Sequence, residues 1–285
     1  MRNIDNIIEG IVPQNTPAGL IQPEEAYEGF ICDQLFPVDP QGGDWEIPLL
    51  DESMQAQEVA IPMQKWGEQA RTLDLMGNGT IHFYTDDYKM EALYSNPAKL
   101  ANCHPRNIVE PNFSLFLDMA PAFGLQAIYK KRVIARMMQD RGTRVFVDLN
   151  VAQKFIKLNL IGVPRGWRSF ATRGYSDRVG GLELEYRIAE TSASFAGRKP
   201  LFVVYGGGQK CKDFCKEVGA IYITPNLDIK NREWEYDQLM KDGVIAFADK
   251  DYSREALEAG KTAARLMQVE DFGKLNELND KDNGY

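Results

Sequence analysis

The sequence predicts an α/β fold: a mainly parallel sheet of about six strands with flanking helices, preceded by an irregular N-terminal arm. Short apolar or β-branched runs recur from residue 80 onward, and segments with helical periodicity separate several of them. Such alternation is typical of a parallel sheet, because each crossover must return the chain to the same end of the sheet. The pattern is compatible with an open sheet and with an incomplete barrel.

Six runs carry the strand signal, and a region rich in turn-forming residues precedes them. Stretches rich in Pro, Gly, Asn and Asp fill much of residues 1–75, which we interpret as an arm or cap. The core domain is expected over 76–230, followed by a helical extension with a frayed tail over 231–285. The expected strands are 80–84, 107–111, 144–149, 168–173, 201–205 and 220–224.

The clearest helix is expected at 119–142. Apolar residues fall on one of its faces, and lysines and arginines cover much of the remainder. Gly142 stands where a glycine commonly ends a helix. Further helices are expected at 180–197, 209–219 and 253–272.

Composition excludes several classes of protein. The 285 residues are 44% hydrophobic and 26% charged, as in an ordinary globular protein. No apolar run is long enough to span a bilayer, and the first residues lack the apolar centre of a signal peptide. The four cysteines are too few and too irregularly spaced for a disulfide framework. We therefore expect a cytoplasmic protein with no membrane partner.

Charge is unevenly distributed along the chain. The net charge is −8, yet residues 125–216 hold 18 Lys and Arg against 7 Asp and Glu. A local excess of positive charge favours polyanionic partners, nucleic acid first among them. The alternative is that the basic segment folds against acidic ones and is neutralised internally. The cations expected to contact nucleic acid are Lys130, Lys131, Arg132, Arg136 and Arg173.

Polar side chains gather where the expected strands end, which is the edge at which parallel α/β sheets bind ligands. Asp86 and Asp87 follow the first strand, and Asp118 lies shortly after the second; these three are the candidate catalytic residues. Such carboxylates can hold a divalent metal, Mg²⁺ or Mn²⁺, with Asp86 and Asp87 as ligands, or act as a general acid and base. They can also cap helices or pair with arginines. Further candidates for the same pocket are Asn112, Ser114, Asp148, Asn150, Tyr205 and Gly206.

Three glycines at 206–208 lead into the helix expected at 209–219 and raise the question of a phosphate cradle. The segment GGGQKC lacks the G-x-x-x-x-G-K-[ST] spacing of a P-loop. It also fails G-x-G-x-x-G, because Cys211 stands where the third glycine should be. A tight corner between strand and helix is the favoured interpretation. The sequence therefore predicts no nucleotide cofactor.

Four short motifs occur in a fixed order. They are Asp86-Asp87-Tyr88, Pro111-Asn112-Phe113-Ser114-Leu115 with Asp118, Gln126 with Arg132, and Tyr205-Gly206. As an ordered set over about residues 80–225, they resemble the phage and mobile-element family known as domain of unknown function 4417. The resemblance implies a phage, prophage or plasmid setting and brings no established reaction. The chain departs from the family pattern at Asn112, where an Asp is expected, and over 148–150.

These observations lead to three hypotheses, and they leave open whether the protein is an enzyme. In the first, a phage or mobile-element protein binds nucleic acid, DNA before RNA, and cuts a phosphodiester or serves in replication. In the second, the same carboxylates belong to a small-molecule or glycan-directed enzyme on a barrel-like scaffold. In the third, the chain is a non-catalytic virion or assembly protein, with copies of itself or other phage proteins as partners.

Overall fold

The computed structural model describes residues 36–67, 75–175, 179–225 and 245–246. The chain divides into two compact units, Met1–Leu35 and Phe36–Tyr285, and every described residue belongs to the second. The helix expected at 253–272 and the first half of the expected arm lie outside the described residues. The described part of that arm is largely irregular, as predicted, with two short 3-10 helices, η2 (Pro40–Trp45) and η3 (Glu52–Met54).

Seven parallel strands form the main sheet, and their spatial order is their order in the chain. All six predicted strands are present. The seventh, β2, lies within the segment expected as an arm, so the sheet begins before residue 76. The strands are β2 (Met63–Lys65), β3 (Thr80–His82), β4 (Asn107–Val109), β5 (Arg144–Asp148), β6 (Ser169–Arg173), β7 (Leu201–Tyr205) and β8 (Ile221–Ile223).

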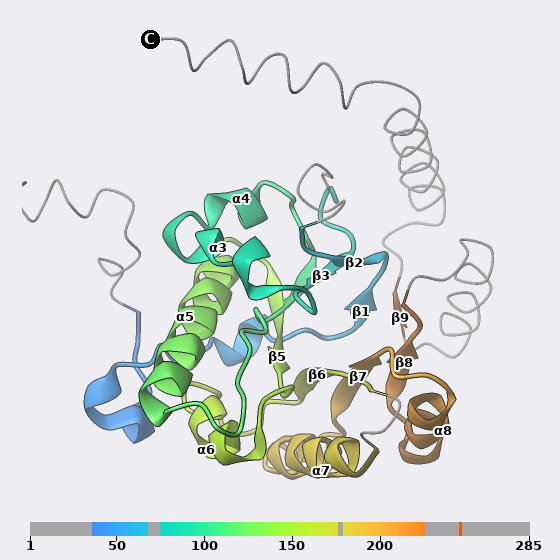
Figure 1. Ribbon diagram of the computed structural model, residues 1–285. Helices are drawn as coiled ribbons and strands as arrows, with labels where there is room; N and C mark the ends of the chain where they lie inside the picture. Colours follow the sequence, from blue (N-terminus) through green and yellow to red (C-terminus); the bar gives the residue numbers. More distant parts are fainter. Residues whose placement is uncertain (1–35, 68–74, 176–178, 226–244, 247–285) are drawn as a thin grey trace, which may run out of the picture. The chain divides into compact units, whose positions relative to one another are not determined.

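The helices form an arc outside the strands (Figure 1). This arrangement follows from the strand order, because right-handed crossovers that advance in one direction place their helices on the same face of the sheet. The helix predicted at 119–142 is α5, which starts at a proline and is followed by Gly142 with a positive φ of 85°. The helices are α3 (Ala92–Ser95), α4 (Ala98–Ala101), α5 (Pro121–Asp140), α6 (Ile156–Asn159), α7 (Val179–Ser194) and α8 (Gln209–Val218), with short 3-10 turns η4 (Asp87–Lys89) and η5 (Gln153–Phe155).

Side chains from distant strands meet on the inner face of the sheet. The ring of His82, on β3, lies 4.0 Å from the ring of Tyr205, on β7, and Tyr84 stacks on Tyr205 at 5.7 Å. In a flat sheet, four strand spacings would separate β3 from β7 by about 19 Å. The sheet is therefore strongly curled. Of the two arrangements compatible with the sequence, the chain adopts the half-barrel.

In the central strands β4 to β7, alternate residues enter two separate apolar cores. On β7, Phe202 and Val204 pack outward among the helices, whereas Val203 and Tyr205 pack inside the half-barrel. This alternation follows from the two-residue period of a strand. Both faces of the sheet are thus covered, as expected for strands with few polar positions.

A stretch of chain crosses the amino-terminal end of the half-barrel; we call residues 53–60 the closing segment. Its last two residues form β1 (Val59–Ala60), which pairs in parallel with β9 (Ile245–Ala246). Inward polar side chains at the strand starts hold its carbonyls: Thr80 donates to Ala60 over 2.6 Å, and Asn107 donates to Glu58 over 2.9 Å. Ser169 donates to Ala56 in the same way. These polar side chains therefore secure the closing segment.

Candidate functional site

At the carboxyl end of the sheet, the three predicted catalytic aspartates have different local roles. Asp87 accepts hydrogen bonds from both the backbone N–H and the hydroxyl of Ser114, each at 3.0 Å, and so ties the loop after β3 to the loop after β4. Asp86 is exposed and pairs with Lys89 at 3.3 Å. Asp118 is exposed ahead of α5. Among the described residues, no three His, Cys, Asp or Glu side chains are grouped to hold a metal ion.

Three of the polar residues at or after the ends of β4 and β5, namely Asn112, Asp148 and Asn150, lie together in a hydrogen-bonded cluster. Asn112 donates to the Asp148 carboxylate over 2.8 Å and to the carbonyl of Asn150 over 2.9 Å. The Asn150 amide donates back to Asn112 over 3.1 Å. Each bond joins neighbouring strand ends, so this cluster fixes the loops relative to each other.

Two of the predicted nucleic-acid contacts, Lys131 and Arg132, are wrong because both side chains are buried. Arg132 is fully buried and pairs with Glu110, while its other guanidinium nitrogen donates to the carbonyl of Asn159. Lys131 is 2% exposed and lies 3.7 Å from the carboxylates of both Glu110 and Asp148. These cations stabilise the junction of α5 with β4 and β5, because a buried charge requires a partner.

The other cations predicted on α5 are also engaged within the fold. Lys130 pairs with Glu91 and lies over the ring of Phe113 at 5.9 Å. Arg136 pairs with Asp140 one turn further along the helix. The internal neutralisation that the sequence left open therefore applies to α5. Of the five predicted contacts, only Arg173 is largely exposed, at the end of β6.

Burial shifts the ionisation of several groups at this end of the sheet. Loss of water around Asp148 raises its pKa, and this effect exceeds the opposing influence of Lys131 and Asn112. Burial also raises the pKa of Tyr84 well above its usual range, with the nearby Asp148 adding to the shift. The pKa of Arg132 is lowered by desolvation although Glu110 opposes the change.

The end of β7 is a tight corner, as the sequence favoured. Tyr205 is buried in the inner core, and the glycine after it has a φ of 76°. A Cβ at Gly207 would lie 2.4 Å from the Cys211 sulfur and 2.7 Å from the Gly174 backbone, so no side chain fits there. Close backbone packing of the loops after β6 and β7 explains the glycines. Gly206 thus has a structural role at a strand end.

The sequence reasoning missed a row of arginines at the opposite, amino-terminal end of the sheet. Arg106, Arg144 and Arg168 stand at or immediately before the first residue of β4, β5 and β6. Arg141 precedes β5 and Arg198 precedes β7. We call these five residues the arginine edge. The signal that could have revealed it was present: an arginine begins or directly precedes three consecutive predicted strands.

Contacts with the closing segment hold three of these guanidinium groups. Arg144 donates to the carbonyls of Ser53 and Gln55 over 3.0 and 3.1 Å. Arg168 donates to the carbonyl of Gln57 over 3.0 Å, whereas Arg106 pairs with the carboxylate of Glu58. Among the described residues, no carboxylate forms an ion pair with any other arginine of the edge.

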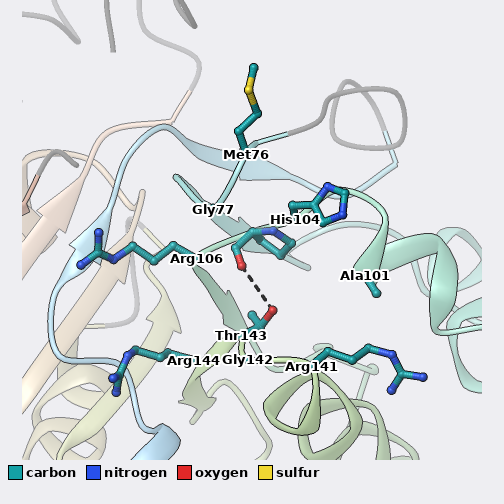
Figure 2. Close-up of a pocket in the computed structure, with 10 residues that line it drawn as sticks. Met76, Gly77, Ala101, His104, Arg106, Arg141, Gly142, Thr143 and Arg144 are labelled. Carbon is teal, nitrogen blue, oxygen red and sulfur yellow. Dashed lines mark hydrogen bonds between the residues drawn. The ribbon is translucent and has the colours of Figure 1, made fainter. Parts of the chain in front are cut away.

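Two openings lie along the arginine edge, and residues of the closing segment line the second of them. The first has a volume of about 430 Å³, and Arg106, Arg141 and Arg144 line it together with His104. Figure 2 shows Arg106 and Arg144 extending to one side of this opening and Arg141 to the other. The second, of about 560 Å³, is lined by Arg168 and Arg198 and by one acidic residue, Glu52. The surface around both openings is therefore predominantly cationic.

Comparison with known proteins finds a family match for the central part of the chain. Residues 39–169 match a described protein family. That family is described as a domain of unknown function (DUF4417). The chain is also 30% identical over 112 residues to the "Gene 1 protein" of Mycobacterium phage D29, a match that covers 37% of this chain and 39% of the phage protein. No solved structure matches the chain.

The DUF4417 match confirms the resemblance predicted from the sequence and places its limits differently. It begins at residue 39, within the expected arm, and ends at the first residue of β6. Four arginines of the edge fall inside the match and Arg198 falls outside it. The closing segment is part of the DUF4417 match as well. None of the helices that the structure describes is both long enough and apolar enough to cross a membrane.

Proposed function

We propose that this phage-associated chain binds nucleic acid along the arginine edge, within the cytoplasm of a host cell, and that DNA is the first expected ligand. One observation carries the proposal. The guanidinium groups of Arg144 and Arg168 are held by neutral backbone carbonyls, so that their positions are fixed while their charges stay uncompensated by any described carboxylate.

Fixed arginines favour phosphate binding for two reasons. A guanidinium group has five N–H donors in a planar fork, and one or two bonds to carbonyls leave the others able to meet phosphate oxygens. A side chain already held in place also loses less conformational freedom on binding. Arg144 uses one terminal nitrogen for both of its carbonyl bonds, which leaves the second terminal nitrogen for a ligand.

The edge is a better candidate than α5, where the sequence first suggested nucleic-acid binding. On α5 each cation meets a carboxylate of the same fold, which reduces the field it presents to a ligand. At the edge, the described residues that line the two openings include five arginines and one glutamate. A contiguous excess of positive charge is the usual electrostatic feature of a nucleic-acid site.

Cleavage is outside this proposal, which concerns binding alone. Asp87 has its acceptor atoms engaged by Ser114, and Asp86 pairs with Lys89. Asp118 is exposed in a separate loop. Nothing that these carboxylates contact supports assigning them a shared chemical step.

The proposal is tested by measuring how DNA affinity depends on salt. Binding of the full chain to fluorescent DNA should weaken linearly in log K against log salt concentration, because phosphate contacts release counterions. The double variant Arg141→Gln/Arg198→Gln removes two cations of the edge that do not hold the closing segment. The magnitude of the slope should then fall by about 1.5, since each phosphate contact contributes roughly 0.7–0.9.

A matched variant gives the control. Arg173→Gln/Lys210→Gln removes the same charge from exposed positions at the end of β6 and at the start of α8, at the other end of the sheet. Its slope and affinity should stay close to those of the unaltered chain. Absence of salt-dependent binding, or an equal loss in both double variants, would overturn the proposal. RNA of the same sequence shows whether the edge prefers DNA.

A further inference from the structure

Beside the arginine edge lies an exposed aromatic ring in contact with a cation. The Phe195 side chain directly follows α7 and is 56% exposed. The guanidinium carbon of Arg165 lies 3.9 Å from the centre of this ring, which is close enough for stacking. A large ring that stays in water although a cation covers part of it is available for a further stacking contact.

The position of Phe195 follows from the course of the chain. Helix α7 starts beyond the carboxyl end of β6 and ends before the start of β7, so its last turn lies at the amino-terminal end of the sheet. Arg168 and Arg198, which line the second opening, precede these same two strands. Phe195 therefore lies at the same end of the sheet as the cationic opening.

The backbone around the ring is held in place. The N–H of Phe195 donates to the carbonyl of Ser192 over 3.3 Å, and the N–H of Arg198 donates to that of Ala193 over 3.1 Å. A Cβ at Gly166 would lie 3.1 Å from Ala196, so the loop carrying Arg165 packs closely against this turn. The ring is thus presented from an ordered turn.

A comparison within the chain separates Phe195 from ordinary exposed apolar residues, which are common on protein surfaces. Phe123, in the first turn of α5, is 64% exposed. Among the described residues it has no cation over its ring. Phe195 differs from it by the stacked arginine and by the neighbouring cationic opening.

We infer that Phe195 is a stacking platform for an unpaired base, and that the ligand of the arginine edge is single-stranded nucleic acid. This inference rests on the proposed function. Surfaces that bind single strands combine a cationic track for phosphates with aromatic rings for bases. In a duplex each base is already stacked and paired, so a ring on the protein surface cannot reach its face.

The test compares three probes over a series of salt concentrations: single-stranded oligo-dT, a DNA duplex of the same length, and heparin, which is a polyanion without bases. The full chain should bind oligo-dT more tightly than the duplex. Phe195→Leu should weaken oligo-dT binding by roughly 5- to 150-fold, the range expected for loss of one base–aromatic stack. The salt slope should not change, because no phosphate contact is removed.

Two further variants serve as controls for the aromatic ring and for its position. Phe195→Tyr retains the ring and should keep oligo-dT binding, whereas Phe123→Leu removes a ring of similar exposure at the other end of the sheet and should have no effect. Binding of heparin and duplex should be the same for all three variants. Tighter or equal binding of duplex, or unchanged oligo-dT binding by Phe195→Leu, would overturn the inference and leave the proposed function standing. Failure of every probe to bind would overturn both.

Discussion

At the scale of single residues, arginines of this chain carry the same charge but differ in burial and in the partners that they contact. Arg132 is buried against Glu110 and lost its water when the chain folded. Arg168 is half-buried and donates to a neutral carbonyl. The first arrangement stabilises the fold only while both charges remain, whereas the second leaves a charge that a ligand can neutralise.

Because the Arg132–Glu110 pair is buried, we expect a large loss of stability when one partner is removed. Arg132→Met should lower the free energy of unfolding by about 3–5 kcal/mol, because it leaves Glu110 buried without its strongest partner. Arg136→Met, one turn along the same helix, removes a more exposed pair with Asp140 and should cost about 0.3–0.5 kcal/mol. Urea unfolding of both variants gives the comparison. Equal losses would show that the Arg132 pair does not behave as a buried one.

The raised pKa of the Asp148 carboxyl leads us to expect a specific dependence of stability on pH. Burial raises its pKa in the folded chain, so between the ordinary value of about 3.9 and the raised value the folded state keeps a proton that the unfolded state releases. Stability contributed by this group is therefore present at low pH and is lost as pH rises through that window. Asp148→Asn cannot ionise, so its stability relative to the unaltered chain should improve from acidic to neutral pH.

Unfolding free energies of the two proteins, measured by urea at several pH values, check this direction. Asp118→Asn supplies the baseline, because that carboxylate is exposed and stays in water on folding. The expectation would be contradicted if the difference in unfolding free energy between the Asp148 variant and the unaltered chain stayed constant with pH. It would also be contradicted if the unaltered chain became relatively more stable as pH rises.

At the scale of elements, the sequence predicted the strands and long helices of the core well. Runs such as 201–205 place apolar residues on both faces, which is the pattern of a strand buried between two layers. Helix α5 shows its periodicity over five turns and has a proline and a glycine at its ends. The short strand β2 was missed because only Met63 of its three residues is apolar, so the segment shows no apolar run.

The candidate site could be predicted only in part. The meeting of Asn112, Asp148 and Asn150 follows from the rule that parallel strands end at one edge. Partners from distant parts of the chain decided the rest. Lys130 meets Glu91, 39 residues away, and Arg168 meets Gln57, 111 residues away. Composition within a window cannot show such pairings, so it could not tell which cations remain uncompensated.

At the scale of the whole half-barrel, the two ends of the sheet have different roles. The carboxyl end holds a hydrogen-bonded cluster and a buried charge network that connect the loops with α5. The amino end is covered by the closing segment, whose carbonyls orient the guanidinium groups of Arg144 and Arg168. In barrels of parallel strands, ligands usually bind at the carboxyl end. The proposed nucleic-acid edge departs from that rule because it is a surface track and requires no enclosed pocket.

The extent of the two cores predicts that the DUF4417 match alone is not a folding unit. A chain that ends at residue 169 loses β6 after its first residue, together with β7, β8, α7 and α8. Each large side chain buried in a core contributes about 1.5–3 kcal/mol, against a net stability of about 5–15 kcal/mol for a domain. The buried apolar side chains removed include Phe170, Ala171, Phe202, Val203, Val204, Tyr205, Phe214, Ile221 and Ile223.

We therefore expect the chain that ends at residue 169 to show no cooperative urea transition and to bind a dye specific for exposed apolar surface. A chain that ends after residue 246 keeps all seven strands and the β1–β9 pair, and it should unfold cooperatively. The difference tests the half-barrel itself, because curling brings Tyr205 of β7 onto His82 of β3. If the shorter chain unfolds cooperatively, β2 to β5 must form a stable core without the strands that now face them.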